Sequence, residues 1–358
     1  MNHEARLEAI RAVTRDNGAD TALISHLPHI RWACGFTGSN GLLVVGPKQA
    51  TLLTDGRYAS QAPEEAPAVT VRIAKAGQNA LRTDPVLKGA KKLLFQADFV
   101  TVSFLERIRA AIPGVELVGE IEWLAPLVAQ KDAEELGSMR KAQGITDAVF
   151  AEVLPLIRHG VSENDISAEI TYRQLKAGAE SMPADFDPIV ASGPNSAKPH
   201  ARASSKKLDL GELVVLDFGC VADGYCSDMT RTVALGNPGD EARSVYEAVK
   251  TAQQAAVAGA RAGVTGKALD GLARASLKQA SYEKYFTHSL GHGVGLEVHE
   301  WPTVSSRNPK PLPAGAAVTI EPGVYLPGKF GVRIEDTVVL GDGGCEVLGG
   351  TDRELIVL

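Results

Sequence analysis

Short apolar runs alternate with helical patterns in the first third of the chain. Runs rich in Leu, Val, Ile and Thr predict strands, because such residues fit the surface of a sheet. Apolar residues that recur every three to four positions predict helices between the strands. The expected strands cover residues 21–25, 41–45, 50–53, 69–73, 92–96 and 115–118, and the expected helices cover 4–16, 57–61, 80–87 and 101–111. This alternation indicates an α/β domain with a mostly buried sheet.

The pattern changes near residues 123–130, where a second domain is expected to begin. A long amphipathic helix is expected over 131–157, kinked or shortened near its end by Pro155. Asp240 and Gly263 are typical cap and stop signals for a later helix. The other expected elements are helices over 164–176 and 241–262, and strand hairpins that pair 213–218 with 225–234 and 317–324 with 331–340. They predict an α+β domain, which divides the chain into domains 1–125 and 126–358.

Composition and charge restrict the classes of function. A length of 358 residues suits about two domains, and a hydrophobic fraction of 44% excludes disorder of the whole chain. The net charge of −6, without a basic block, makes nucleic acid and membrane surfaces unexpected partners. We find no apolar segment of signal-peptide or membrane-spanning length, so we expect a soluble cytoplasmic protein. Four scattered cysteines without a CxxC pair argue against a disulfide scaffold or a cysteine zinc site.

Two carboxylates stand in the first hairpin. Asp217 lies in the middle of an apolar run, where a buried carboxylate needs a cation or several hydrogen-bond donors. A turn at Asp223-Gly224 would place Gly219 opposite Asp228, and thus Asp217 and Asp228 diagonally on one face, roughly 5–8 Å apart. Two acids at that spacing could flank a pair of divalent metal ions. The alternative is one solvated acid and one turn acid.

The second hairpin repeats this arrangement. Glu321 and Glu335 each interrupt an apolar strand, and a three-residue loop centred on Gly328 would bring them opposite each other. Arg333 and Thr337 share the face of Glu335. The alternative here is a buried Arg–Glu network without a metal ion.

Three of the eight histidines, His288, His292 and His299, lie in one glycine-rich segment. The glycines at 291, 293 and 295 argue against a zinc-binding helix and favour an irregular loop that presents an imidazole. Four carboxylates carry a charge of −4, which two divalent ions would neutralise. Oxygen-rich ligation with one imidazole suits Mn²⁺, Fe²⁺, Co²⁺ or Zn²⁺.

These residues, in this order and in these contexts, resemble the pita-bread metallopeptidases, and within that fold the Xaa-Pro peptidases aminopeptidase P and prolidase. The motifs DFG, SDMTRT, GHGVGLEVHE, TIEPGVY and GVRIED carry the resemblance over residues 131–358. The N-terminal part resembles a creatinase-type domain. There, GFTGSNG at 35–41 and TDGRY at 54–58 look closer to the bacterial aminopeptidase P branch.

The resemblance implies a role for each residue. Asp217 would bind one metal ion, Asp228 and Glu335 would bridge both, and His292 and Glu321 would complete the other site. Glu321 would also transfer a proton from the attacking water to the leaving amine. The resemblance assigns the remaining residues to catalysis or to substrate binding: His200, His288, His299 and Arg333.

The expected function is therefore that of an Xaa-Pro aminopeptidase with two divalent metal ions. Mn²⁺ is the expected metal, with Co²⁺, Zn²⁺ or Fe²⁺ as alternatives. Short peptides that begin with Xaa-Pro are the expected substrates, and a homodimer is the expected assembly. The alternatives are an Xaa-Pro dipeptidase and, more remotely, a non-catalytic module that binds peptides or proteins. Lys198 would favour a substrate carboxylate if it pointed inward, and otherwise would be solvated.

Overall fold

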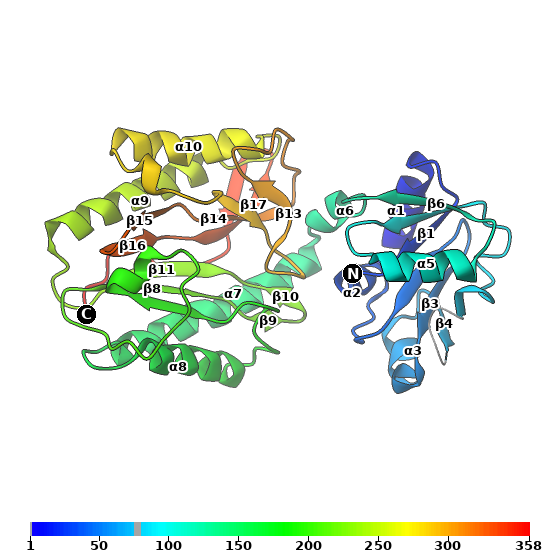
Figure 1. The fold of residues 1–358 in the computed structure, drawn as a ribbon, viewed down its shortest axis with the longest axis horizontal. Coiled ribbons are helices and arrows are strands. Elements are labelled where there is room, and N and C mark those ends of the chain that lie inside the picture. The colour runs from blue at the N-terminus through cyan, green and yellow to red at the C-terminus, as the bar shows by residue number, and fades with distance from the viewer. Residues whose placement is uncertain (1, 75–79) are drawn as a thin grey trace. The chain divides into compact units, whose positions relative to one another are not determined.

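A computed structural model describes residues 2–74 and 80–358 of the chain (Figure 1). The chain forms two compact units, Met1–Val128 and Ala129–Leu358. Among the described helices, none is both long and apolar enough to cross a membrane.

The first unit is built on a six-stranded mixed sheet in the order β4-β3-β2-β1-β5-β6. Its strands are β1 Thr21–Ile24, β2 Leu42–Val45, β3 Ala50–Thr54, β4 Thr70–Ile73, β5 Lys92–Gln96 and β6 Glu116–Glu120. Its helical segments are α1 His3–Asp16, α2 Leu27–Cys34, η1 Gly56–Tyr58, α3 Gln61–Glu65, α5 Val102–Ala111 and α6 Ala125–Ala129. All six predicted strands are present, and β1–β3 and β5 are almost fully buried.

In this unit one predicted helix was wrong and one observed helix was missed. Residues 82–89 run through turns, whereas a helix was expected as far as residue 87. Conversely, the sequence analysis missed α2, whose 8 residues are fewer than the roughly 11 over which an apolar period can be recognised. Its local signals are nevertheless present, with a proline in its first turn and Gly35 at its C-terminus in the left-handed conformation, at φ 90°.

The second unit places its strands between two pairs of helices (Figure 1). The helices are α7 Ala133–Val153, α8 Glu163–Lys176, α9 Gly239–Gly259 and α10 Gly266–Gln279, and the short 3₁₀ turns are η2 Leu154–Leu156, η3 Gly193–Ala197 and η4 Glu283–Tyr285. Helix α7 gives way to η2 at Pro155, as expected. Capping boxes at Asp132 and Ser162 begin α7 and α8.

The strands of this unit form small antiparallel sheets. A three-stranded sheet in the order β11-β8-β7 contains β7 Ile189–Ser192, β8 Leu213–Phe218 and β11 Met229–Ala234. A five-stranded sheet in the order β13-β12-β14-β17-β18 contains β12 Gly291–Gly293, β13 Glu300–Val304, β14 Ala317–Ile320, β17 Asp336–Gly341 and β18 Gly344–Val347. Two further pairs join β9 Val221–Ala222 with β10 Tyr225–Cys226, and β15 Gly323–Leu326 with β16 Phe330–Arg333.

Helix α9 differs from its prediction at both ends. It starts at Gly239 after Pro238, so Asp240 lies in its first turn rather than at its cap, where its charge still complements the helix dipole. It ends at Gly259 instead of reaching Gly263, and a second helix, α10, follows that the sequence analysis did not predict. The Thr265 side chain caps α10 by accepting a hydrogen bond from the backbone of Ala268.

The predicted registers of both hairpins are confirmed. Thr230 pairs with Asp217, and Asp223 and Gly224 form the turn with φ values of 49° and 79°. In the second hairpin Ile320 pairs with Asp336 and Gly323 with Arg333, which is the register expected to bring Glu321 opposite Glu335. The strand pairing therefore carries each pair of acids to the same face of its hairpin.

Candidate functional site

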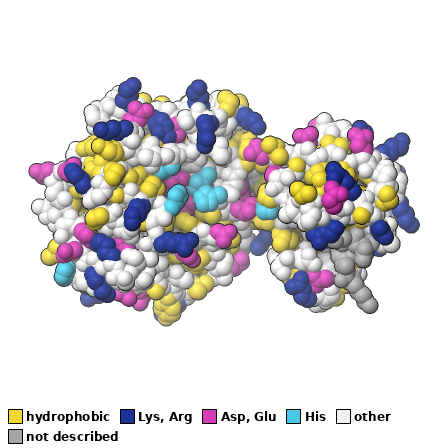
Figure 2. Space-filling view, viewed as in Figure 1, with side chains coloured by type: hydrophobic (Ala, Val, Ile, Leu, Met, Phe, Trp, Pro, Cys, Tyr) yellow, Lys and Arg dark blue, Asp and Glu magenta, His cyan; other side chains and the backbone are white. Residues whose placement is uncertain are grey.

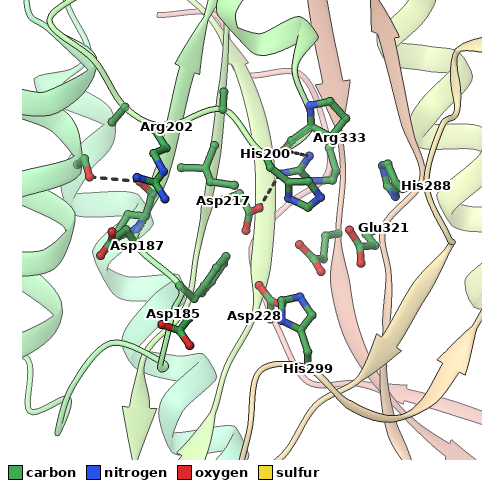
Figure 3. A pocket seen from close by; sticks show the side chains of 18 of the residues that line it. Asp185, Asp187, His200, Arg202, Asp217, Asp228, His288, His299, Glu321 and Arg333 are labelled. Carbon is green, nitrogen blue, oxygen red and sulfur yellow. Dashed lines mark hydrogen bonds and ion pairs between the residues drawn. The ribbon is translucent and has the colours of Figure 1, made fainter.

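A cavity of about 760 Å³ lies in the second unit (Figure 3). Histidine side chains gather on the face of this unit that Figure 2 shows. All nine of the predicted site residues line the cavity: His200, Asp217, Asp228, His288, His292, His299, Glu321, Arg333 and Glu335.

The cluster of acids and one imidazole comes from five separate elements. Asp217 lies on β8 and His292 on β12. Asp228 directly precedes β11, Glu321 directly follows β14, and Glu335 directly precedes β17. The ligand atoms of Asp228, His292 and Glu335 all lie within 4.8 Å of one another. His292 Nε2 lies 3.3 Å from Glu321 Oε1 and 3.7 Å from Asp228 Oδ2. The second hairpin thus meets the first one across the imidazole.

His292 is presented by a strand and not by the irregular loop that was expected. Its neighbours Gly291 and Gly293 lie on β12, where a Cβ atom would collide with the backbone of Thr319 and Trp301 respectively. The glycines therefore permit close strand packing rather than a loop. His292 Nδ1 lies 3.1 Å from the Gly293 carbonyl, which directs Nε2 toward the carboxylates.

The cluster concentrates negative charge in a buried place. Burial, together with neighbouring carboxylates, raises the pKa values of Asp228 and Glu335 well above their usual range, and burial also raises the pKa of Asp217. Burial alone would lower the pKa of His292, but the hydrogen bond and charge of Glu321 raise it to about 9. The same contact lowers the pKa of Glu321 to about 2, against the effect of burial.

The site fits divalent cations. The Oδ1 atoms of Asp217 and Asp228 are buried and have no hydrogen-bond partner among the described residues, which is costly unless a cation binds them. Carboxylate oxygens with one imidazole nitrogen are suitable ligands for Mn²⁺, Fe²⁺, Co²⁺ or Zn²⁺. This cluster could hold two such ions with the four acids neutralised.

All three side-chain nitrogens of Arg333 donate hydrogen bonds beside this cluster. Its Nη2 donates to Asp217 Oδ2 at 2.5 Å, and its Nη1 donates to Tyr325 Oη at 2.7 Å and to the Pro199 carbonyl at 3.0 Å. Its Nε donates to Thr230 Oγ1, which in turn donates to Glu335 Oε2 at 2.6 Å. Arg333 therefore orients carboxylates of both hairpins.

Sequence reasoning missed Tyr325 and Thr230. Tyr325 connects Arg333 to His288, whose Nε2 lies 2.8 Å from the phenol oxygen. Burial raises the pKa of Tyr325 to about 12, so the phenol keeps its proton. The signal for Thr230 was available, because the predicted register already placed it opposite Asp217.

The remaining histidines lie at the cavity wall. The ring of His299 lies 4.3 Å from that of His292, and its pKa is lowered by burial and by the charge of His292. His200 is exposed at the cavity. Lys198 is also exposed, but it donates to Asn195 Oδ1 at 3.2 Å and does not line the cavity, so the solvated alternative holds for this lysine.

A buried glutamate anchors the segment that carries His200. Glu163 is fully buried and accepts five hydrogen bonds, from Ser192, Asn195 and Ser204. These bonds fix the backbone on both sides of residues 199–203, all of which line the cavity. The wall of the cavity is thus held by a carboxylate that does not itself line it.

Comparisons with known proteins agree with this geometry. Residues 137–342 match metallopeptidase family M24, and residues 6–124 match the creatinase/prolidase N-terminal domain. The chain is 36% identical to the Xaa-Pro dipeptidase of Pyrococcus furiosus over 98% of this chain and 99% of that protein.

Solved structures extend the similarity to the whole fold. An Xaa-Pro dipeptidase from Bacillus anthracis superposes with a TM-score of 0.96 at 38% identity, covering 100% of both chains. An X-Pro aminopeptidase from Thermotoga maritima superposes with a TM-score of 0.89 at 38% identity, covering 97% of this chain and 100% of that one. These matches confirm the predicted fold class, a creatinase-like α/β domain followed by an α+β pita-bread domain.

Proposed function

Because the chain belongs to metallopeptidase family M24, we propose that it is an Xaa-Pro dipeptidase, an enzyme that hydrolyses the bond before a C-terminal proline. The convergence of Asp217, Asp228, His292, Glu321 and Glu335 at one cavity carries this proposal. An Xaa-Pro peptidase was expected from the sequence, and the family assignment confirms that expectation.

The sequence analysis expected an aminopeptidase, with a dipeptidase as the alternative, and we propose the reverse. The motifs at 35–41 and 54–58 favoured an aminopeptidase P, but several relatives at 36–40% identity are named Xaa-Pro dipeptidase. The aminopeptidase remains the second candidate, supported by the similar structure from Thermotoga maritima.

The family uses divalent metal ions, and we assign the five residues of the cluster as their ligands. We propose Mn²⁺ as the metal, since the donor set is rich in oxygen. When bound, such ions polarise the scissile carbonyl and lower the pKa of a coordinated water. We also propose that the protein is a homodimer and that it is located in the cytoplasm, which sedimentation equilibrium and cell fractionation test.

The residues of the chain supply proton transfer and orientation. Glu321 accepts a proton from the attacking water while the water oxygen bonds to the carbonyl carbon. The C–N bond then breaks, and Glu321 delivers the proton to the proline nitrogen, which carries no hydrogen of its own in the peptide. We assign His299 and His200, which line the cavity, as hydrogen-bond donors to the substrate and to the developing oxyanion. Arg333 holds Asp217 in place throughout.

The test compares substrates after metal removal. The protein is treated with a chelator, Mn²⁺ is restored, and hydrolysis of an Xaa-Pro dipeptide, an Xaa-Pro-Yaa tripeptide and a non-proline dipeptide is measured. Metal-dependent cleavage of the proline dipeptide alone supports the dipeptidase. Preferential cleavage of the tripeptide supports the aminopeptidase, and no cleavage of either supports a binding module.

A matched pair of variants tests the ligand assignment. Asp217→Asn should lower the bound metal per chain and the activity, because an amide lacks the negative charge that the ion requires. Asp223→Asn, at the exposed turn of the same hairpin, should change neither, since asparagine tolerates the left-handed conformation at φ 49°. Equal metal content in both variants would refute Asp217 as a ligand.

A further inference from the structure

Two arginines line the cavity, and they differ in how their charge is used. Arg333 is buried, and its donors are committed to Asp217, Tyr325, Thr230 and the Pro199 carbonyl. Arg202 is exposed, and its guanidinium makes no hydrogen bond or ion pair with any described residue. Figure 3 shows it on the wall opposite Glu321 and His288. Arg202 is therefore the arginine of this cavity that is available to a ligand.

The backbone that carries Arg202 is fixed. On one side, Pro199 accepts a hydrogen bond from Arg333, and on the other, Ser204 donates two hydrogen bonds to Glu163. The carbonyl of Arg202 itself lies 3.5 Å from the Asn195 amide nitrogen, which also donates to Glu163. A ligand that binds Arg202 therefore has to order its side chain but not its backbone, which limits the entropic cost of binding.

Apart from the histidines, the other ionisable groups that line the cavity are acidic. Asp185 and Asp187 line the same wall as Arg202, but neither forms an ion pair with it. The remaining acids belong to the proposed metal cluster, where two divalent ions would neutralise them. A zwitterionic dipeptide brings one ammonium and one carboxylate, and Arg202 is the open cavity cation that matches the carboxylate.

We propose that Arg202 binds the C-terminal carboxylate of the substrate and thereby sets a preference for dipeptides. This inference rests on the proposed function. A guanidinium recognises a carboxylate through two parallel hydrogen bonds, which fixes the orientation of the proline. In a tripeptide the carboxylate lies one residue further along, about 3.5 Å away, so the same contact is lost.

The experiment measures how much the C-terminal carboxylate of the substrate contributes to kcat/KM. We compare kcat/KM for an Xaa-Pro dipeptide with kcat/KM for its C-terminal amide, in the Mn²⁺-loaded enzyme and in the variants R202M, R202K and K198M. The wild-type ratio of acid to amide should fall by about 10- to 100-fold in R202M, the loss expected for one hydrogen-bonded charge pair. R202K keeps the charge without the planar fork, so it should retain part of the ratio.

K198M is the matched control, because Lys198 is a nearby exposed cation that does not line the cavity. Its acid-to-amide ratio should equal that of the wild type. An unchanged ratio in R202M, with dipeptide cleavage retained by the wild type, would overturn the role of Arg202 alone. A wild-type enzyme that cleaves no proline dipeptide would instead refute the proposed dipeptidase. The two failures are therefore distinguishable.

Discussion

Replacing Lys131 by Met should destabilise the second unit far more than removing an exposed lysine. Lys131 Nζ lies 2.6 Å from Glu300 Oε1, and the two side chains are only 1% and 9% exposed. The ammonium also donates to the Ala129 carbonyl at 3.1 Å. Methionine matches the length of the lysine stem but brings no charge, so the variant leaves the Glu300 carboxylate buried without its cation.

The size of the effect follows from burial. Removing one partner of a buried ion pair costs about 3–5 kcal/mol, because the remaining charge stays out of water. For a unit of this size each kcal/mol corresponds to a shift of about 2–4 °C, so the unfolding temperature should fall by about 6–20 °C. Lys141 and Asp223 form an ion pair at 2.8 Å that is 54% and 52% exposed, and Lys141→Met should cost less than about 1 kcal/mol.

The loss should also depend on pH. Burial raises the pKa of Glu300 even with Lys131 present, and removing the ammonium raises that pKa further. The folded state then binds the Glu300 proton more tightly than the unfolded chain does, so stability falls as pH rises through the interval between the two pKa values. The deficit of Lys131→Met should therefore be largest at neutral pH and shrink as the solution is acidified.

Calorimetry of the full-length protein at several pH values measures both effects. Hydrogen-exchange mass spectrometry identifies which transition belongs to residues 129–358. The double variant Lys131→Met/Glu300→Gln should recover part of the loss, because it removes the unpaired charge. Equal unfolding temperatures for Lys131→Met and Lys141→Met would refute the reasoning.

Three further predictions concern single contacts. Tyr325→Phe removes the link between Arg333 and His288 and should lower kcat/KM for an Xaa-Pro dipeptide by about 10-fold, with unchanged activity as the contrary result. Gly293→Ala should lower the free energy of unfolding in urea by at least about 1–3 kcal/mol, because the added Cβ would meet backbone atoms of β13. The control Gly343→Ala should leave that free energy unchanged, since its Cβ would meet nothing within 4 Å. Burial raises the pKa of all four cysteines, to about 11 for Cys34, but Cys345 alone among them is only partly buried. Iodoacetamide at pH 8 should therefore label Cys345 first in the native protein, and equal labelling rates by mass spectrometry would contradict this.

The hairpins could be predicted because their register is determined by residues that lie close together in the sequence. The alternation of buried residues fixes which face each acid occupies, and the Asp223-Gly224 turn fixes the register. The same reasoning failed at His292, because the glycines on either side of it are required by packing against two neighbouring strands, which the local pattern does not show. Only the packing of β12 against β14 and β13 explains why residues 291 and 293 have no side chain.

The positions of the side chains around the cavity wall were harder to predict from the sequence. Arg202 is one of many charged residues in a polar stretch, and its position depends on Glu163, which lies 41 residues from Ser204. Such a contact has no local pattern. Lys198 illustrates the same difficulty, since it stands only two residues from His200 and yet turns away to Asn195.

The register of the two hairpins also determines where the chain tolerates a change in length. One residue inserted into a strand between an acid and its turn would move that acid to the opposite face, away from the cluster. At the tip of the second hairpin an insertion meets no packed neighbour, since residues 327–329 are exposed and a Cβ at Gly328 would meet nothing within 4 Å. Insertions should therefore be accepted at the tip of the second hairpin and rejected a few residues away in its strands, which makes residues 327–329 a suitable place for an inserted label.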